Sequence, residues 1–234
     1  MDNQGLCIVP ARGGSKRFPR KNLAKLGGQS LVERAIDAAL ESNLFSRVVL
    51  SSDDDEILTL GEPYGAKVEP IKRDAKLATD NATALELVCE ITKQFSNQHS
   101  FVALLLPTAP LRTSTHLVEG FKKMMLSDEI DGVVSLTTYE FPPQLSIVLE
   151  NEFIKPVFSP CPLIEGNTRS QDQALIYRPN GAFYMQKLPS FSKNQNFWKG
   201  NVVGYVMDRK VSADIDSAFD LKVASLLIDE TKLN

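Results

Sequence analysis

The sequence predicts a three-layer α/β/α fold with a mostly parallel, mixed sheet. Strand-like and helix-like segments alternate as far as residue 136, the strand-like segments are short apolar runs, and the helix-like segments repeat apolar residues at helical spacing. At 234 residues, with 43% hydrophobic and 24% charged residues, the chain is long enough for one large domain with its own core.

The expected elements follow one another in chain order. Ser30 and Glu33 have the spacing of a capping box, which places a helix start at residue 30. Gly65 is expected to close the helix that starts at residues 53–56. Expected strands cover residues 6–10, 47–50, 101–106 and 132–136, and expected helices cover 30–40, 53–65, 83–96 and 114–126.

The alternation breaks after residue 137. Short strand-like pieces at 145–149 and 153–156 surround a proline-rich stretch, so this region is expected to leave the main sheet. Two further strands are expected at 181–185 and 202–207, and a helix from about 217 to 230. We therefore expect one domain over residues 1–234, with about 140–170 as an irregular insertion.

Composition argues against several classes of protein. A net charge of −3 does not favour a general nucleic-acid binder, and no apolar run approaches the ~20 residues of a membrane span. The N-terminus lacks the pattern of a secretory signal. The three cysteines form no CxxC pair or even framework, so a reducing cytoplasm is the expected compartment. The two histidines, His99 and His116, are expected to lie on the surface or to cap helices.

The loop after the first expected strand is the strongest functional feature. Gly13 and Gly14 allow the backbone to present amides to an anion, and Arg12 and Lys21 can supply the charge that a triphosphate needs. Neither G-x-x-x-x-G-K-[ST] nor G-x-G-x-x-G is present, which argues against a P-loop ATPase and a dinucleotide-binding dehydrogenase. The alternative is a solvated basic surface loop. Five cations lie within ten residues here: Arg12, Lys16, Arg17, Arg20 and Lys21.

This loop, and several motifs in the same order along the chain, resemble the CMP-sialic acid synthetase (acylneuraminate cytidylyltransferase) family. Asp74 stands at a position where that family usually has proline. The matching positions are Ala11, Arg12, Ser15, Lys16, Pro19, Lys21 and Asn22; Arg73, Leu77, Asp80 and Thr83; 105–112; 169–172; 177–184; and 212–216.

The resemblance implies a nucleotidyltransferase of Rossmann-like fold that transfers CMP from CTP to the anomeric hydroxyl of a sialic-acid-type nonulosonic acid and releases diphosphate. It also implies Mg²⁺ and a homodimer whose contacts include the 140–170 insertion. No nucleic-acid or membrane partner is expected. The nucleotide is expected to contact Ala11, Arg12, Gly13, Gly14, Ser15, Lys16, Lys21, Asn22, Arg73 and Thr83.

Two carboxylates near the end of the matched region complete the expected catalytic group, which is Arg12, Lys21, Asp214 and Asp216. In an extended segment, residues two apart point to one side, so Asp214 and Asp216 can converge on one cation, and carboxylate oxygens suit Mg²⁺. The alternative is that residues 216–220 simply cap the last helix. The acidic stretch 53–56 is interpreted only as the start of a helix and is left out of the site.

The resemblance implies that the acceptor sugar is bound by the second half of the chain, with Phe197 and Trp198 as an apolar wall or as ordinary core residues. Leu106 stands where the family often has a glutamine that contacts the sugar. This difference leaves room for legionaminic or pseudaminic acid as the acceptor. The candidate sugar contacts are Arg169, Gln171, Arg178 and Asn180.

Two other classes of function remain as alternatives. A glycosyltransferase of similar fold would transfer sugar without releasing diphosphate, and a non-catalytic nucleotide-binding module would bind CTP without turnover.

Overall fold

A computed structural model describes residues 5–74, 76, 83–95 and 98–231. Within these residues, a mixed sheet has the strand order β11-β7-β10-β6-β1-β4-β5. Strand β10 is antiparallel to both of its neighbours, and all other strands run parallel, as predicted. The strands are β1 (Gly5–Pro10), β4 (Phe45–Ser52), β5 (Val68–Lys72), β6 (Phe101–Leu104), β7 (Gly132–Thr138), β10 (Tyr177–Lys187) and β11 (Val202–Val206).

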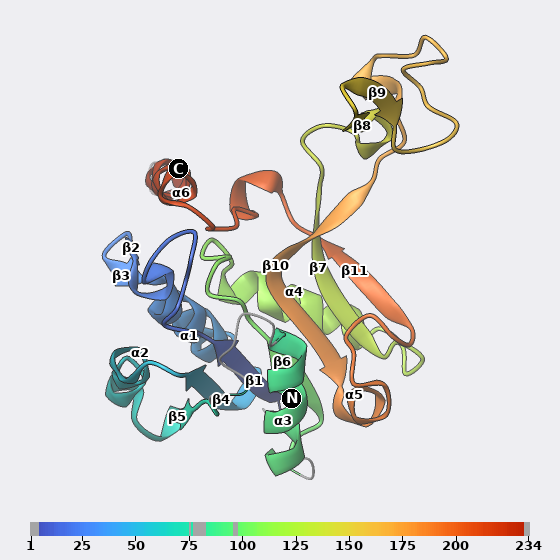
Figure 1. The fold of residues 1–234 in the computed structure, drawn as a ribbon. Coiled ribbons are helices and arrows are strands. Elements are labelled where there is room, and N and C mark those ends of the chain that lie inside the picture. The colour runs from blue at the N-terminus through green and yellow to red at the C-terminus, as the bar shows by residue number, and fades with distance from the viewer. Residues whose placement is uncertain (1–4, 75, 77–82, 96–97, 232–234) are drawn as a thin grey trace.

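Helices cover both faces of this sheet, which confirms the three-layer prediction (Figure 1). Helices α1 (Leu31–Glu41) and α4 (Ser114–Met124) pack on one face, and α3 (Ala84–Phe95) and α5 (Leu188–Asn194) pack on the other. The short α2 (Asp55–Thr59) lies beside β4 and β5, while α6 (Ala218–Thr231) lies next to the small hairpin β2 (Lys25–Leu26)–β3 (Gln29–Ser30). Among the described helices, none is long and apolar enough to cross a membrane.

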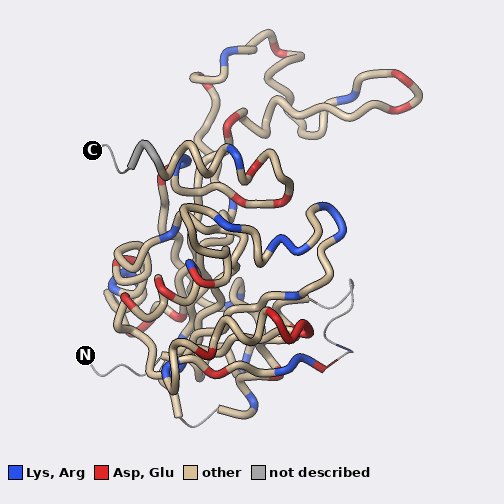
Figure 2. The backbone as a smooth tube through the Cα atoms, turned by 90° about the vertical axis from the view of Figure 1, so that its left-hand side faces the viewer, with Lys and Arg blue, Asp and Glu red and all other residues tan. Residues whose placement is uncertain are grey.

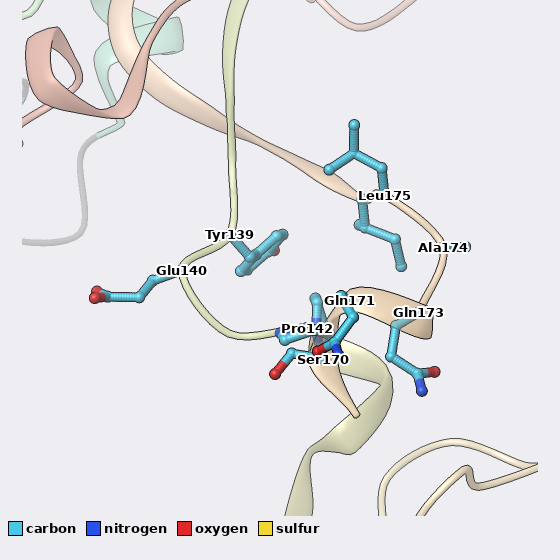
Figure 3. Close-up of a pocket in the computed structure, with 10 residues that line it drawn as sticks. Tyr139, Glu140, Pro142, Ser170, Gln171, Gln173, Ala174 and Leu175 are labelled. Carbon is cyan, nitrogen blue, oxygen red and sulfur yellow. The ribbon is translucent and has the colours of Figure 1, made fainter. Parts of the chain in front are cut away.

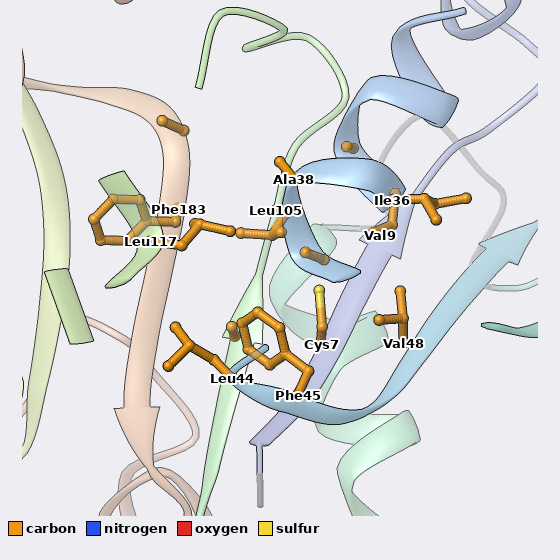
Figure 4. Close-up of a cluster of buried hydrophobic side chains, with 14 of the residues drawn as sticks. Cys7, Val9, Ile36, Ala38, Leu44, Phe45, Val48, Leu105, Leu117 and Phe183 are labelled. Atoms are coloured by element: carbon orange, nitrogen blue, oxygen red, sulfur yellow. The ribbon is translucent and has the colours of Figure 1, made fainter. Parts of the chain in front are cut away.

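Alternating side chains of β1 serve two cores. Cys7 and Val9 belong to the cluster under α1 and α4, whereas Leu6 and Ile8 belong to the cluster under α3 and α5. Both pairs are fully buried, as expected for a strand with helices on each side. Figure 4 shows the first cluster, where Cys7 and Val9 lie near Leu105 and the α1 residue Ile36.

The helix starts are better predicted than the ends. The expected capping box is present: the Ser30 hydroxyl accepts from the Glu33 amide at 3.2 Å, and the Ser30 amide donates to the Glu33 carboxylate at 2.7 Å. The expected helix 53–65 is divided, because α2 ends at Thr59 and a 3₁₀ segment (Glu62–Lys67) follows, with Gly65 at φ 58°. Strand β5, helix α5 and the β2–β3 hairpin were not expected.

Residues 139–176 leave the body of the protein between β7 and β10, and we call this segment the excursion (Figures 1 and 2). It contains the two-stranded sheet β8 (Ile147–Glu150)–β9 (Phe153–Pro156). Large apolar side chains on it are exposed, including Leu149 (70%), Phe153 (74%) and Ile164 (75%). A monomer rarely leaves so many apolar side chains together in water.

Candidate active site

The candidate residues come from segments that meet at one edge of the sheet. The loop 11–22 follows β1, the loop 105–112 follows β6, and the segment 207–217 follows β11, so all three leave the carboxyl ends of parallel strands. Because β10 is antiparallel, its first residues, including Arg178, reach the same edge. This is the edge at which open α/β sheets bind ligands.

The cationic loop and the acidic pair contact each other directly. The Lys21 ammonium lies 2.9 Å from Oδ1 of Asp216, and the Arg17 guanidinium lies 2.9 Å from Oδ2 of the same carboxylate. The Lys21 side chain is only 13% exposed, while that of Asp216 is 37% exposed. Residues 195 positions apart in sequence therefore form one charged group. Figure 2 shows Lys and Arg following one another closely in the loop after β1.

Asp214 is the second carboxylate of this group. Ile215 is fully buried and its amide donates to the Thr108 carbonyl at 2.7 Å, which fixes the backbone between the two acids. Burial raises the pKa of Asp214, and the neighbouring Asp216 acts in the same direction. A hydrogen bond from the Thr108 side chain and the charges of Lys21 and Arg178 oppose that rise. Asp214 thus lies among groups of both signs, from three segments.

The structure confirms the capping alternative for residues 216–220, but the acid that caps the helix is Asp220 and not Asp216. The cap of α6 is formed by Ser217 and Asp220: the Asp220 carboxylate accepts from the Ser217 amide at 2.7 Å, and the Asp220 amide donates to the Ser217 hydroxyl at 3.3 Å. Asp220 also accepts from the backbone amide of Asp216 at 3.0 Å. The carboxylate of Asp216 is therefore directed to the cationic loop, not to the helix.

Side chains of the residue after β4 and of the loop itself hold the cationic loop in shape. The Gly13 amide donates to Asp53 at 2.9 Å, and the Asn22 side chain donates to the Arg12 carbonyl at 2.8 Å. Gly13 also packs so closely on Asp54 that a Cβ there would lie 2.7 Å from the carboxylate. Asp53 was left out of the predicted site, and its contact with Gly13 has no signature in the sequence. Asp54 does cap α2, as the helix-start interpretation implied.

Arg73 joins the same group from the end of β5. Its guanidinium donates to the Ser51 carbonyl at 3.0 Å, and its Nε is buried without a hydrogen-bond partner in the described part of the chain. Burial lowers the pKa of Arg73; the charge of Asp53 counteracts this effect and that of Arg12 adds to it. Arg12, Asp53 and Arg73 therefore lie within electrostatic reach of one another.

The other predicted nucleotide contacts differ in burial and in hydrogen bonding. Thr83 forms a capping box with Glu86 at the start of α3, with its hydroxyl accepting from the Glu86 amide at 3.2 Å. The motif positions Leu77 and Asp80 lie outside the described residues. Ala11 is fully buried, Ser15 is half-buried, and Gly14 and Lys16 are exposed in the loop.

A broad cleft of about 1330 Å³ opens beside the acids. Arg178 and Asp214 lie on its wall together with Arg209 and Lys210, so the cleft offers three cations near one candidate metal ligand. Phe219 adds an apolar surface from α6. The lining also carries the acids Glu140, Asp208 and Asp220, so the cleft suits a polar ligand with groups that pair with both signs of charge.

Asn180 does not lie where the sugar prediction requires. It is 1% exposed, its amide nitrogen donates to the Ser212 hydroxyl at 2.9 Å, and its oxygen accepts from the Ala182 amide at 3.2 Å. The motif resemblance could not distinguish an inward from an outward amide. In this structure Asn180 connects β10 to the segment that carries the acids, and we correct its role accordingly.

Arg169 and Gln171 lie on the excursion, which projects away from the acids of the same chain (Figure 1). Gln171 lines a smaller pocket of about 240 Å³, together with Tyr139 and Leu175 (Figure 3). These two candidates are therefore not brought to the edge of the sheet where the other site residues meet.

The aromatic and histidine predictions have separate outcomes. Phe197 is 3% exposed in the core, whereas Trp198 is 54% exposed and packs edge-on against Tyr184. His116 accepts from the Thr113 amide at 3.0 Å at the start of α4, and His99 contacts the Ser46 hydroxyl, so both histidines fit the capping or surface interpretation.

The donor set at the acids fits a hard divalent cation. Asp214 and Asp216 supply carboxylate oxygens, and the described residues contain no group of three or more His, Cys, Asp or Glu side chains that could hold a metal. A metal here would need further ligands from water and from a ligand's phosphates. Mg²⁺ binds in this way, through one or two carboxylates and substrate phosphates.

Comparisons with known proteins identify the family of the chain. The cytidylyltransferase family profile matches residues 6–213. The chain is 34% identical to a pseudaminic acid cytidylyltransferase of Campylobacter jejuni, over 96% of each chain. It is 31% identical to an N-acylneuraminate cytidylyltransferase of Escherichia coli, over 94% of this chain but only 51% of that protein. The fold is similar to that of a CMP:2-keto-3-deoxy-manno-octonic acid synthetase in complex with CTP, with a TM-score of 0.68, 14% identity, and coverage of 97% of this chain and 99% of that one.

Proposed function

Because the chain belongs to the cytidylyltransferase family and is a nucleotidyltransferase, we propose that it transfers CMP from CTP to the anomeric hydroxyl of a sialic-acid-type nonulosonic acid. Diphosphate is the second product. The observation that carries the proposal is the 2.9 Å contact between Lys21 and Asp216, because it joins the loop suited to phosphates to the acids suited to a metal. The three free cysteines favour the cytoplasm as the place of action.

The reaction is a single in-line displacement at phosphorus. The oxygen of the sugar hydroxyl forms a bond to the α-phosphorus of CTP, the bond from that phosphorus to the bridging oxygen breaks, and the hydroxyl proton passes to a carboxylate or to solvent. Catalysis then depends chiefly on position and charge neutralisation. Arg12, Lys16 and Lys21 neutralise the phosphates, and Asn22 and Arg73 orient CTP and its base.

Asp214 and Asp216 would hold Mg²⁺ together with the phosphates. When bound, the cation stabilises negative charge on the phosphate and lowers the pKa of a coordinated hydroxyl. In this structure the Lys21 ammonium and the Arg17 guanidinium pair with the carboxylate of Asp216, so these two cations lie beside the position that the metal and the phosphates would share.

Measurement of diphosphate tests this function. Purified protein is incubated with CTP, Mg²⁺ and a panel of nonulosonic acids, and diphosphate and CMP-sugar are quantified. We expect both products in equal amounts with at least one acid. Sugar transfer without diphosphate would favour a glycosyltransferase, and CTP binding without turnover would favour a nucleotide-binding module.

Pseudaminic acid is a second candidate acceptor, and Leu106 favours it. This side chain is half-buried in the apolar cluster under α3 and α5 and would lie 3.3 Å from a Cβ at Gly181. An aliphatic group cannot donate or accept a hydrogen bond, so an acceptor pocket that included Leu106 would suit a sugar with fewer hydroxyls better than one that needs an amide partner. We expect Leu106→Gln to shift the ratio of kcat/KM values toward N-acetylneuraminic acid. An unchanged ratio would remove Leu106 from acceptor selection.

We also propose that the excursion joins two copies into a homodimer. Its exposed apolar residues need a partner surface, and Arg169 and Gln171 can reach a sugar only if they serve the site of a second copy. Phe153→Asp should convert the dimer to a monomer in light scattering after size exclusion. Leu126→Asp is the control, because Leu126 is 77% exposed and lies outside the excursion. A wild-type monomer at micromolar concentration would contradict the proposal.

A further inference from the structure

Arg112 is a buried cation that the proposed chemistry does not use. It is 3% exposed, and it lies at the end of the loop 105–112. Burial lowers its pKa to about 10, so it still carries its charge at neutral pH. Within the described residues its side-chain hydrogen bonds go to backbone carbonyls, and its Nε and Nη2 are buried without a partner. A buried arginine in such surroundings is costly, which directs attention to what its contacts achieve.

The contacts of Arg112 join two segments of the site. Its Nη1 donates to the Leu106 carbonyl at 2.7 Å and to the Ala182 carbonyl at 2.8 Å. Ala182 lies where the register of β10 shifts between Pro179 and Tyr184, so its carbonyl is free to accept from a side chain. One nitrogen of Arg112 thus connects the loop after β6 to the interruption in β10.

The loop fixed by Arg112 contains the residue that contacts Asp214. The Leu106 carbonyl also accepts from the Ala109 amide at 3.2 Å, which closes a tight turn around Thr108. Thr108 receives the Ile215 amide on its carbonyl at 2.7 Å, and its side chain forms a hydrogen bond with Asp214. A continuous chain of hydrogen bonds through one turn therefore joins Arg112 to the carboxylate of Asp214.

Asn180 supports the same arrangement from the opposite side. It accepts from the amide of Ala182, whose carbonyl Arg112 holds, and it donates to Ser212, two residues before Asp214. The acidic segment is thus fixed at Thr108 through Arg112 and at Ser212 through Asn180. Both supports converge on the backbone of Ala182.

We propose that Arg112 is a positioning residue that sets the place of the Asp214 carboxylate by holding the Thr108 turn against β10. It contacts neither nucleotide nor sugar in this arrangement; it acts through Thr108. The proposal rests on the function proposed above, since it assigns a metal-holding role to Asp214. Residues that orient metal ligands usually change metal affinity or activity by about 10- to 100-fold when they are replaced.

The test compares Arg112→Met with Arg112→Lys. In the presence of CTP and without sugar, Mn²⁺ binding is measured by the loss of the free-ion electron paramagnetic resonance signal, and turnover is measured separately by diphosphate release. We expect Arg112→Met to weaken Mn²⁺ binding and lower kcat by about 10- to 100-fold, with KM for CTP changed less than about threefold. Arg112→Lys keeps one charged donor and should fall between Met and wild type.

Two further variants separate positioning from general stability. Arg47→Met is the matched control, because Arg47 is half-buried, pairs with Glu69 and stacks on Phe95 at the far edge of the sheet. Thr108→Val should reproduce the Mn²⁺ defect, and the double variant Thr108→Val/Arg112→Met should be little worse than either alone, because both act on one path.

The outcomes are distinguishable. Wild-type Mn²⁺ affinity in a folded Arg112→Met protein, or fully additive defects in the double variant, would overturn the proposal. If Arg112→Met does not fold, the comparison of Arg112→Lys with Thr108→Val decides instead: normal Mn²⁺ binding in both also overturns it. If wild type releases no diphosphate with any acid, the proposed function fails, whatever Arg112 does.

Discussion

Replacement of Asp216 by asparagine tests the centre of the proposed site. The change keeps the shape of the side chain but removes the charge that Lys21 and Arg17 contact at 2.9 Å. Lys21 is mostly buried, whereas Arg17 is 77% exposed. The contribution of these ion pairs to stability therefore lies between that of an exposed pair, roughly 0.2–1 kcal/mol, and that of a buried pair. Loss of repulsion between Asp216 and Asp214 offsets part of the cost.

We therefore expect the free energy of unfolding to fall by only about 1 kcal/mol, which lowers Tm by roughly 2–4 °C in a domain of this size. Activity should fall much further. If one of two metal carboxylates supplies ~3–4 kcal/mol of the charge stabilisation that a metal brings, its loss slows turnover about 10²- to 10³-fold. A large loss of turnover together with a small loss of stability is what we expect of a residue that acts in the site.

The assay is diphosphate release at saturating CTP, sugar and Mg²⁺, with differential scanning calorimetry for Tm. Asp208→Asn is the control, because Asp208 lines the same cleft but contacts the 3₁₀ segment that follows it, not the cationic loop. The reasoning would be refuted if Asp216→Asn kept more than a tenth of the wild-type kcat. A fall in Tm of more than about 10 °C would instead show that the ion pair is structural.

Three further predictions follow from the loop and the acids. Gly13→Ala should lower the free energy of unfolding in urea titration by about 1–3 kcal/mol, because its Cβ would collide with a neighbouring carboxylate. Gly14→Ala is the control and should be neutral, because the space around Gly14 is open. Equal effects of the two changes would contradict the close packing at Gly13. Asp214→Asn should raise Tm at pH 7.5, because burial raises the pKa of this carboxyl and its ionisation therefore destabilises the folded state. The gain in Tm should shrink as pH falls toward the ordinary pKa of 3.8, and a gain that is independent of pH would exclude this cause. Arg12→Ala should raise KM for CTP and lower kcat in steady-state assays, while Arg20→Ala, whose guanidinium pairs with a surface glutamate, should change neither by more than about twofold; unchanged kinetics in the first variant would remove Arg12 from the site.

Those parts of the fold that depend on local pattern could be predicted. The apolar runs 6–10 and 101–106 are buried parallel strands, and Ser30 and Glu33 form the expected capping box. Strand β5 was missed because Val68 is its one buried residue and Pro70 interrupts it, and helix α5 was missed because Pro189 lies in its first turn. In both places a proline weakened the pattern, although it is tolerated at an edge strand and at a helix start.

For the candidate site, the sequence allowed a proposal of the residue types but not of the direction in which each side chain points. Lys21 and Asp216 contact each other as the motifs required. Asn180 and Asp53 have roles opposite to the predicted ones: the amide expected to face the sugar is buried, and the acid left out of the site binds the Gly13 amide. Orientation depends on which backbone groups lack partners after the sheet has formed, as at the register shift in β10.

The contact between residues 21 and 216 has a consequence for how the enzyme is made. While the ribosome is still adding the last strands, the early loop is already outside but its acidic counterpart does not yet exist. A partial chain that ends before residue 216 lacks the acidic half of this charged group. Both halves of the proposed site are therefore present only after synthesis has passed residue 216.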